Sequence, residues 1–230
     1  MSTSQQLTRP AVLTEQYAAV ARGLIDVYVG KGQTRPFDGA SFETIGHRWD
    51  DPATVNVITA ADLVALSTLS VPVPASGAIG LLGRNAEKAS RLLAKIPLRL
   101  SLSDAEPRFI DGSSPAHELW TLIRSHKDMG PTRTSKLMAR KRPFLIPIFD
   151  SVVEEALGMD GSAGHWAGMR GLLTADEGDL HQHLLRLRTE SGLPDHVSPL
   201  RVFDIVVWMH GARPELSARL ALDQGLVPAV

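Results

Sequence analysis

The chain has 230 residues, of which 43% are hydrophobic and 21% are charged, so it can bury a core without disulfides or a structural metal. It contains no cysteine, which excludes a disulfide framework, a thiolate zinc site and a cysteine nucleophile. The 24 basic and 25 acidic residues nearly cancel, and the chain shows neither a signal-peptide pattern nor a run of about 18 apolar residues. We therefore expect a cytoplasmic protein that does not span a membrane and needs neither a metal nor a cofactor.

Helical periodicity dominates the chain, and we expect about ten short helices. The first covers Thr14 to Val29, where apolar residues recur at steps of three and four before two glycines. Thr59 and Asp62 form a capping box ahead of the second helix, and Ser114 followed by Pro115 is a typical helix start. The other helices are predicted over 75–82, 85–96, 131–140, 151–157, 163–173, 178–188, 199–210 and 214–222.

Strand signals are weak by comparison. Segment 143–149 contains two prolines in seven residues, and each proline removes a ladder donor, so we expect a buried extended linker there. Segment 98–102 alternates apolar and polar side chains and is a candidate for an isolated extended piece. The expected fold is all-α, with a single helical domain over 10–225. The stretch 98–113 is the best candidate for a junction between two lobes.

One segment, 124–142, concentrates basic charge. It carries seven Lys or Arg against one acid, so its local charge is about +6 and the rest of the chain carries about −7. On a helix that starts near Pro131, the side chains of Arg133, Lys136 and Arg140 share one stripe, which predicts an exposed positive face. Two interpretations remain open. The face is either a solvated helix surface or a phosphate-binding site in which helix-start amides and cationic heads act together.

The residues around this segment follow a recognisable order. A helix over 115–126, a turn ending in Gly130 and a second helix are followed by a proline-rich segment that leads to Asp150, twenty residues after Gly130. This order resembles the signature of the helix-hairpin-helix DNA glycosylases of base excision repair. The resemblance implies a module over 115–157 in which the Gly130 hairpin grips the DNA backbone and Asp150 is the catalytic aspartate.

The sequence also departs from that family. Asp128 stands where the family has the first of two hairpin glycines, and Thr132 stands where bifunctional members have a nucleophilic lysine. If the protein is an enzyme, the resemblance therefore implies a monofunctional glycosylase-like hydrolase.

Asp150 has two open interpretations. It is either the N-cap of the next helix or, because Ser151 and Glu154 form a capping box of their own, a free carboxylate. A free carboxylate would stabilise the developing cationic sugar or orient water.

The chain is also similar to an uncharacterised family of actinobacterial proteins. The similarity lies in Ser135–Pro147 and Thr59–Ala65. It implies no activity.

The expected function is nucleic-acid binding, with DNA as the partner and an enzymatic step left open. The alternative is a non-enzymatic protein-interaction or regulatory module whose basic stripe pairs with acidic groups of a partner or of the chain itself. The sequence assigns no oligomeric state. The candidate residues are Asp150 for catalysis, and Gly130, Thr132, Arg133, Lys136, Arg140 and Lys141 for nucleic-acid binding.

Overall fold

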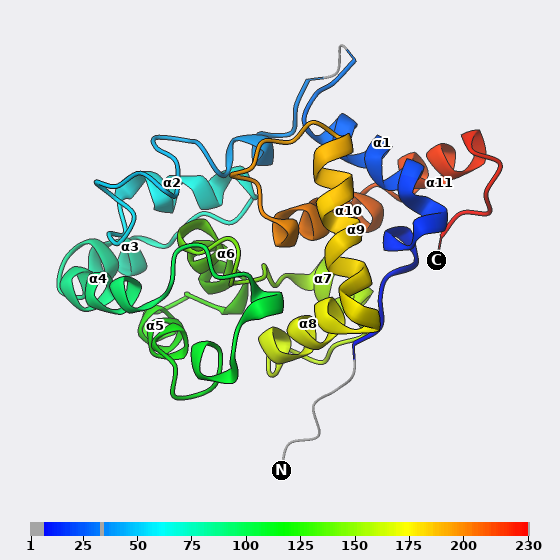
Figure 1. The fold of residues 1–230 in the computed structure, drawn as a ribbon. Coiled ribbons are helices and arrows are strands. Elements are labelled where there is room, and N and C mark those ends of the chain that lie inside the picture. Colours follow the sequence, from blue (N-terminus) through cyan, green and yellow to red (C-terminus); the bar gives the residue numbers. More distant parts are fainter. Residues whose placement is uncertain (1–6, 33–34, 230) are drawn as a thin grey trace. The chain divides into compact units, whose positions relative to one another are not determined.

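A computed structural model describes residues 7–32 and 35–229. In this part of the chain there are eleven α-helices and several 3-10 turns but no strand, which confirms the predicted all-α fold (Figure 1). The helices are α1 (Ala18–Tyr28), α2 (Ala60–Thr68), α3 (Ala75–Leu82), α4 (Ala86–Lys95), α5 (Pro115–Arg124), α6 (Pro131–Lys141), α7 (Ser151–Ala156), α8 (His165–Thr174), α9 (Asp179–Glu190), α10 (Pro199–Ala212) and α11 (Pro214–Asp223).

The helices form two compact units. Unit 1 combines the chain up to Phe37 with the chain from Asp150 onward, and unit 2 is the continuous segment Asp38–Phe149. The stretch 98–113, the predicted junction, lies within unit 2. All candidate residues of the basic segment therefore belong to unit 2, whereas Asp150 belongs to unit 1.

Unit 2 is built around α6. Helix α6 packs against α2 and α5, and α4 packs against α5. The inward face of α4 consists of Ala89, Leu92 and Leu93, as its periodicity predicts. Between residues 35 and 59, the described chain forms a 3-10 turn at Asp38–Ser41 and otherwise runs irregularly. Its own backbone hydrogen bonds are confined to local turns, such as those from Ile45 to Ser41 and from Val55 to Asp51. Connections of this length without regular structure are uncommon in compact domains.

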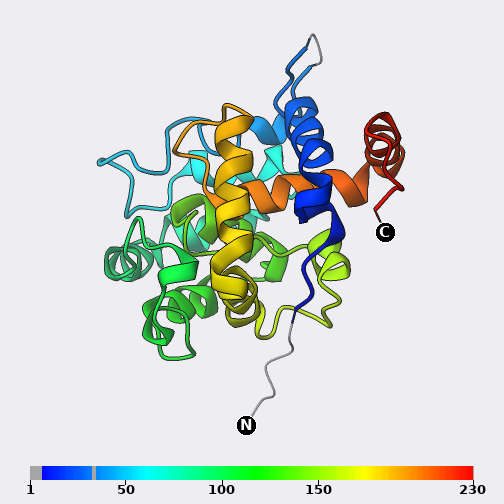
Figure 2. The same cartoon turned by 45° about the vertical axis from the view of Figure 1, so that its right-hand side comes forward.

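Unit 1 is built around α10. Ser198 caps this helix and Pro199 occupies its first position, and most of its side chains are buried. Helix α10 packs against α1, α7, α9 and α11, and Figure 2 shows α9 lying across it. Its buried Arg201 forms an ion pair with Asp204 and donates to the Tyr28 hydroxyl at 2.7 Å, so its charge is compensated inside the unit.

Local signals located most helix starts. Thr59 and Asp62 form the predicted capping box at α2, and Ser114 caps α5 with Pro115 in the first turn. The first helix begins later than predicted, because residues 15–17 form a 3-10 turn before Ala18. Segment 143–149 is largely buried but opens with a turn, since the amides of Leu145 and Ile146 both donate to the Arg142 carbonyl.

Candidate nucleic-acid interface

The hairpin between α5 and α6 has an open backbone at Gly130. This glycine is the N-cap of α6, with φ −70° and ψ 178°, a conformation that any residue adopts. A Cβ atom placed on Gly130 would have no heavy atom within 4 Å. The glycine is therefore not required by the turn itself, and the space in front of it is free for an outside group.

The first turn of α6 keeps unpaired donors next to that space. No side chain of the described residues caps the helix, and Pro131 at the first position has no N–H. The Thr134 amide is already bonded to the Gly130 carbonyl at 3.0 Å. The amides of Thr132 and Arg133 are therefore the ones that point out of the helix start, where the helix dipole favours an anion.

Asp128 takes the conformation that a glycine would favour. Its φ is +64°, in the left-handed region, and aspartate is one of the few residues with a side chain that tolerates it. This position is the one at which the sequence departs from the two-glycine hairpin. The departure is therefore compatible with a tight turn.

The hairpin rests on α3 through His126. A Cβ on Gly80 would lie 2.2 Å from the imidazole, so only glycine allows this approach, and Asn85 Nδ2 lies 3.1 Å from His126 Nε2. Burial, assisted by the positive charge of Arg84, lowers the pKa of His126. The ring is thus neutral at pH 7, and Arg84 lies close enough to the hairpin for its charge to be felt there.

The cations nearest the hairpin differ in their surroundings. Lys127 is exposed, and Arg133 is half-buried, with its guanidinium donating to the Pro72 carbonyl at 2.8 Å and the Asp128 carbonyl at 3.0 Å. These bonds hold the Arg133 side chain beside the turn but do not neutralise it, because both acceptors are uncharged.

The prediction that α6 has an exposed positive face is wrong beyond the first turn of the helix. Lys136, Arg140 and Lys141 are all buried, because α2, α5 and the irregular segment before α2 cover the helix on several sides. The Lys136 ammonium lies 3.4 Å from the Leu69 carbonyl. These three side chains are not placed to contact an external phosphate.

Arg140 and Lys141 pair with a single buried carboxylate, Asp62 of α2. Arg140 Nε lies 3.1 Å from Asp62 Oδ1 and Lys141 Nζ lies 3.0 Å from Asp62 Oδ2. The Arg140 guanidinium also donates to the carbonyls of Phe42, Ile45 and His47, and the Lys141 ammonium donates to the Thr54 carbonyl. The two cations thus fasten the irregular segment before α2 onto α6.

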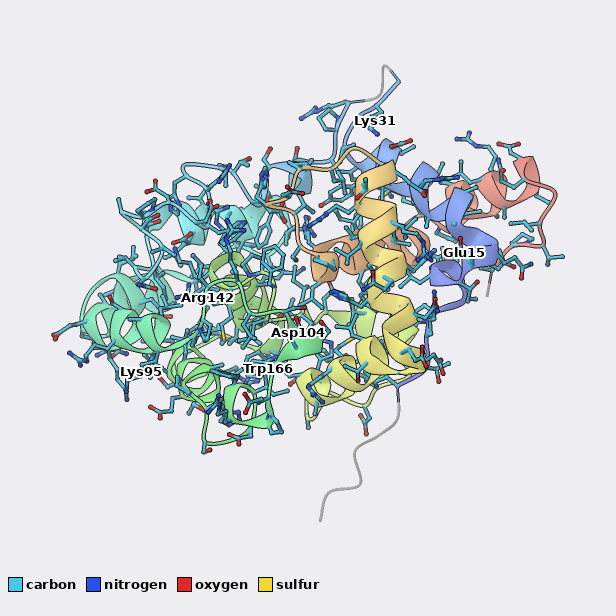
Figure 3. The ribbon with its side chains drawn as sticks, in the orientation of Figure 1. Glu15, Lys31, Lys95, Asp104, Arg142 and Trp166 are labelled. Carbon is cyan, nitrogen blue, oxygen red and sulfur yellow. The ribbon has the colours of Figure 1, made fainter. Side chains whose placement is uncertain are left out.

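Arg142 plays a similar part at the end of α4. Its guanidinium donates to the carbonyls of Leu93 at 2.5 Å and Ile96 at 2.9 Å, which lie at the helix C-terminus where a cation is favoured. It also bonds to the Val55 carbonyl and to Asn56 Oδ1. Burial lowers its pKa to about 10, so it stays charged at neutral pH. Figure 3 labels this side chain among the helices of unit 2.

Asp150 is the N-cap of α7. Its Oδ1 accepts the amides of Val152 at 3.2 Å and Val153 at 3.1 Å. Ser151 is the first helical residue and not the cap, and Glu154 accepts the Gly161 amide at 2.6 Å instead of closing a capping box. The expected free carboxylate is therefore engaged in helix capping, and only 8% of the residue is exposed.

His165 is a buried neighbour of Asp150 in unit 1. Burial lowers the pKa of His165 to about 4, and the attraction of Asp150 offsets only part of that shift. The ring is neutral at pH 7. Asp150 therefore accepts helix amides and lies near a neutral imidazole.

The sequence pattern did not indicate Asp62 as the partner of the basic segment. It was expected to act only in the α2 capping box, which it does, with the Thr59 amide at 2.9 Å from Oδ2. Its second role depends on α2 packing against α6. No local signal in the sequence announces a pairing across 78 positions.

Among the described residues, no three His, Asp or Glu side chains group in a way that would hold a metal ion. No described helix is long and apolar enough to cross a membrane.

Comparisons with known proteins give a family and no activity. The model of one family, described as "Family of unknown function (DUF6308)", matches residues 21–211. No curated protein matches the chain, and no solved structure matches it.

Proposed function

The chain belongs to this family of unknown function, and we propose that it binds nucleic-acid backbones, without catalysis, through the hairpin that starts α6. The observation that carries the proposal is the open space at Gly130 beside the uncapped amides of Thr132 and Arg133. Phosphate groups bind at helix starts of this kind, because the free N–H groups and the helix dipole both favour their negatively charged oxygens.

Charge around the hairpin supports the same interpretation. Lys127 is exposed, Arg133 is held beside the turn by neutral carbonyls, and Arg84 lies near enough to lower the pKa of His126. Cations placed next to phosphate-binding amides add affinity that does not depend on base sequence. Lys136, Arg140 and Lys141 are left out of this proposed interface because they are buried.

Base excision is not part of the proposal. The resemblance to the glycosylases assigns catalysis to Asp150, but this carboxylate already accepts two amides at the start of α7. Binding at the hairpin requires no free carboxylate.

The test is a titration of a fluorescent 20-base-pair duplex with the full chain at several salt concentrations. Contacts to about two phosphates at the hairpin alone predict a logarithmic salt slope of about −2 or steeper. Gly130→Val fills the open space with a branched side chain and should weaken binding at least tenfold. Because the backbone at Gly130 is extended and unobstructed, the variant should fold normally.

Gly112→Val is the matched control. Gly112 also has no heavy atom within 4 Å of an added Cβ, and it lies in the same unit, in the segment before α5. Its variant should bind as the unmodified chain does. Salt-independent or absent binding, or unchanged binding by Gly130→Val, would overturn the proposal.

A second candidate function is favoured by the ion pairs of Asp62 with Arg140 and Lys141. These pairs use part of the basic segment inside the fold, as expected for a protein-interaction or regulatory module that does not bind nucleic acid. The same titration separates the candidates, since the second predicts no duplex binding even at low salt.

A further inference from the structure

Helix α4 carries a row of cations that the basic segment does not include. Arg84 in the preceding turn is followed by Lys88, Arg91 and Lys95, at steps of four, three and four residues. Such steps keep side chains on one side of a helix, and eleven residues at about 1.5 Å each give a row about 16 Å long. All four side chains are exposed, and Figure 3 labels Lys95 on the outer side of α4.

These cations are not used inside the fold. Only Arg91 forms an ion pair, with the exposed Glu87 one turn earlier, which is the one acid on α4. Within the described residues, the side-chain heads of Arg84, Lys88 and Lys95 have neither an ion pair nor a hydrogen bond. Arg140 and Lys141 differ from them, because their charged groups form ion pairs with Asp62 and hydrogen bonds with backbone carbonyls.

The row begins beside the hairpin. Asn85, next to Arg84, contacts His126, and α3 supports the hairpin through Gly80. The positive potential of Arg84 reaches His126. The exposed cations of α4 and the open amides of α6 therefore lie on connected elements of one unit.

We infer that this row, formed by Arg84, Lys88, Arg91 and Lys95, is a second contact for the phosphate backbone of duplex DNA. The inference rests on the proposed hairpin function and extends it. A regularly spaced row about 16 Å long matches a polyanion with repeated charges, and a duplex presents one phosphate per about 3.4 Å along each strand. The hairpin contacts about two phosphates, and the row follows the backbone away from them.

An anionic membrane is the competing partner for this surface. Two apolar side chains near the row, Ile79 at 74% exposed and Leu82 at 41%, would suit insertion between lipids. The uncapped helix start with its open glycine favours a phosphate held at a fixed point, which a duplex supplies. The experiment below includes vesicles so that either partner gives a definite result.

The test compares the full chain with Lys88→Gln/Arg91→Gln/Lys95→Gln on the same 20-base-pair duplex. Each lost phosphate contact reduces the salt slope by about 0.9, so a slope of about −4 to −5 should fall to about −2. Arg84 is left unchanged because it lies beside the hairpin. Since none of the three side chains is buried, circular dichroism and the urea midpoint should not change.

Arg22→Gln/Arg186→Gln/Arg219→Gln is the matched control. It removes the same number of positive charges from unit 1, where Arg22 is half-buried and Arg186 and Arg219 are exposed, so it separates a local contact from an effect of net charge. Its salt slope should equal that of the unmodified chain.

The other possible results of this experiment each contradict a different part of the proposal. A slope unchanged in the α4 variant but reduced affinity in Gly130→Val would overturn the second contact and leave the hairpin function standing. An equal loss in the control would overturn the local contact as well. No duplex binding by the unmodified chain would overturn the hairpin function and this inference together. Binding to vesicles with 30% phosphatidylserine that depends on the α4 cations, without duplex binding, would assign the row to membranes.

Discussion

Asp62 in unit 2 and Asp150 in unit 1 are buried carboxylates that the fold compensates in different ways. Asp62 faces two cations, Arg140 and Lys141, at about hydrogen-bond distance. Asp150 has two helix amides and a neutral imidazole around it. The first carboxylate is paired with opposite charges from distant sequence, and the second accepts hydrogen bonds from amides of the helix that it caps.

The two sites also differ in the ionisable side chain that lies beside each carboxylate, which is Lys141 for Asp62 and His165 for Asp150. Burial lowers the pKa of both Lys141 and His165, and a carboxylate pulls each of them back. For His165 the result is a pKa of about 4, so the imidazole is neutral at pH 7. The Lys141 ammonium lies 3.0 Å from Asp62 Oδ2 in an ion pair. The carboxylate of Asp62 thus lies beside charged side chains, whereas the carboxylate of Asp150 lies beside a neutral imidazole.

The largest expected effect is that of Asp62→Asn. Removing this charge leaves Arg140 and Lys141 buried without a counter-ion, which should cost about 3 to 5 kcal/mol of unfolding free energy. Urea denaturation measures the loss. Glu118→Gln, an exposed acid of α5, is the control and should change stability by less than about 0.5 kcal/mol.

A rescue variant sharpens this prediction. Combining Asp62→Asn with Arg140→Met and Lys141→Met removes the uncompensated charges and should recover part of the lost stability. If the single variant loses under about 1 kcal/mol, the two cations do not depend on Asp62 and the comparison fails.

The next largest expected effect is a loss of stability at low pH caused by protonation of His165. Its pKa is about 6.5 when unfolded and about 4 when folded, so the unfolded state binds the proton first as the pH falls. Stability should therefore be full above pH 6.5 and decline between pH 6.5 and 4, by up to about 3 kcal/mol from this group. Unfolding curves across that range provide the measurement.

His165→Gln separates this group from the others. The variant should be less stable near neutral pH but show a shallower decline, with the remainder due to His126, His183 and His210, whose pKa values burial also lowers. An equally steep decline in the variant would show that His165 does not titrate as described.

The smallest expected effect is that of Asp150. Asp150→Ala removes the α7 cap and should cost about 1 kcal/mol, and Asp150→Asn should cost less because its side-chain oxygen still accepts the amides. Thermal unfolding compares the two. An alanine variant as stable as the unmodified chain would mean that the cap contributes nothing.

Local signals predicted most of the fold because they depend on neighbouring residues. Thr59 with Asp62 and Ser114 with Pro115 marked helix starts through bonds that span three residues. The periodicity of α4 identified Ala89, Leu92 and Leu93 as its buried side. The late start of α1 was missed because a 3-10 turn of three residues directly before the helix is too short to show a period of its own.

The candidate site was predicted less well, for a physical reason. The stripe of Arg133, Lys136 and Arg140 follows from the phase of a single helix, but exposure depends on what packs against it. The acceptors of Arg140 lie in Asp62 and the segment near Phe42, far away in sequence. Conversely, the row on α4 is visible as steps of four, three and four residues, and it is less dense in charge than 124–142.

Unit 1 is built from two segments of the chain, one before and one after unit 2, and this arrangement sets the order in which unit 1 can assemble during synthesis. Helix α1 packs chiefly on α10, which begins only at Pro199, and all of unit 2 is translated between them. The apolar stripe of α1, including Val20 and Leu24, leaves the ribosome long before its native cover exists. During most of translation, the nascent chain therefore exposes the apolar face of α1. A chaperone that binds α1 early would protect this face until α10 emerges.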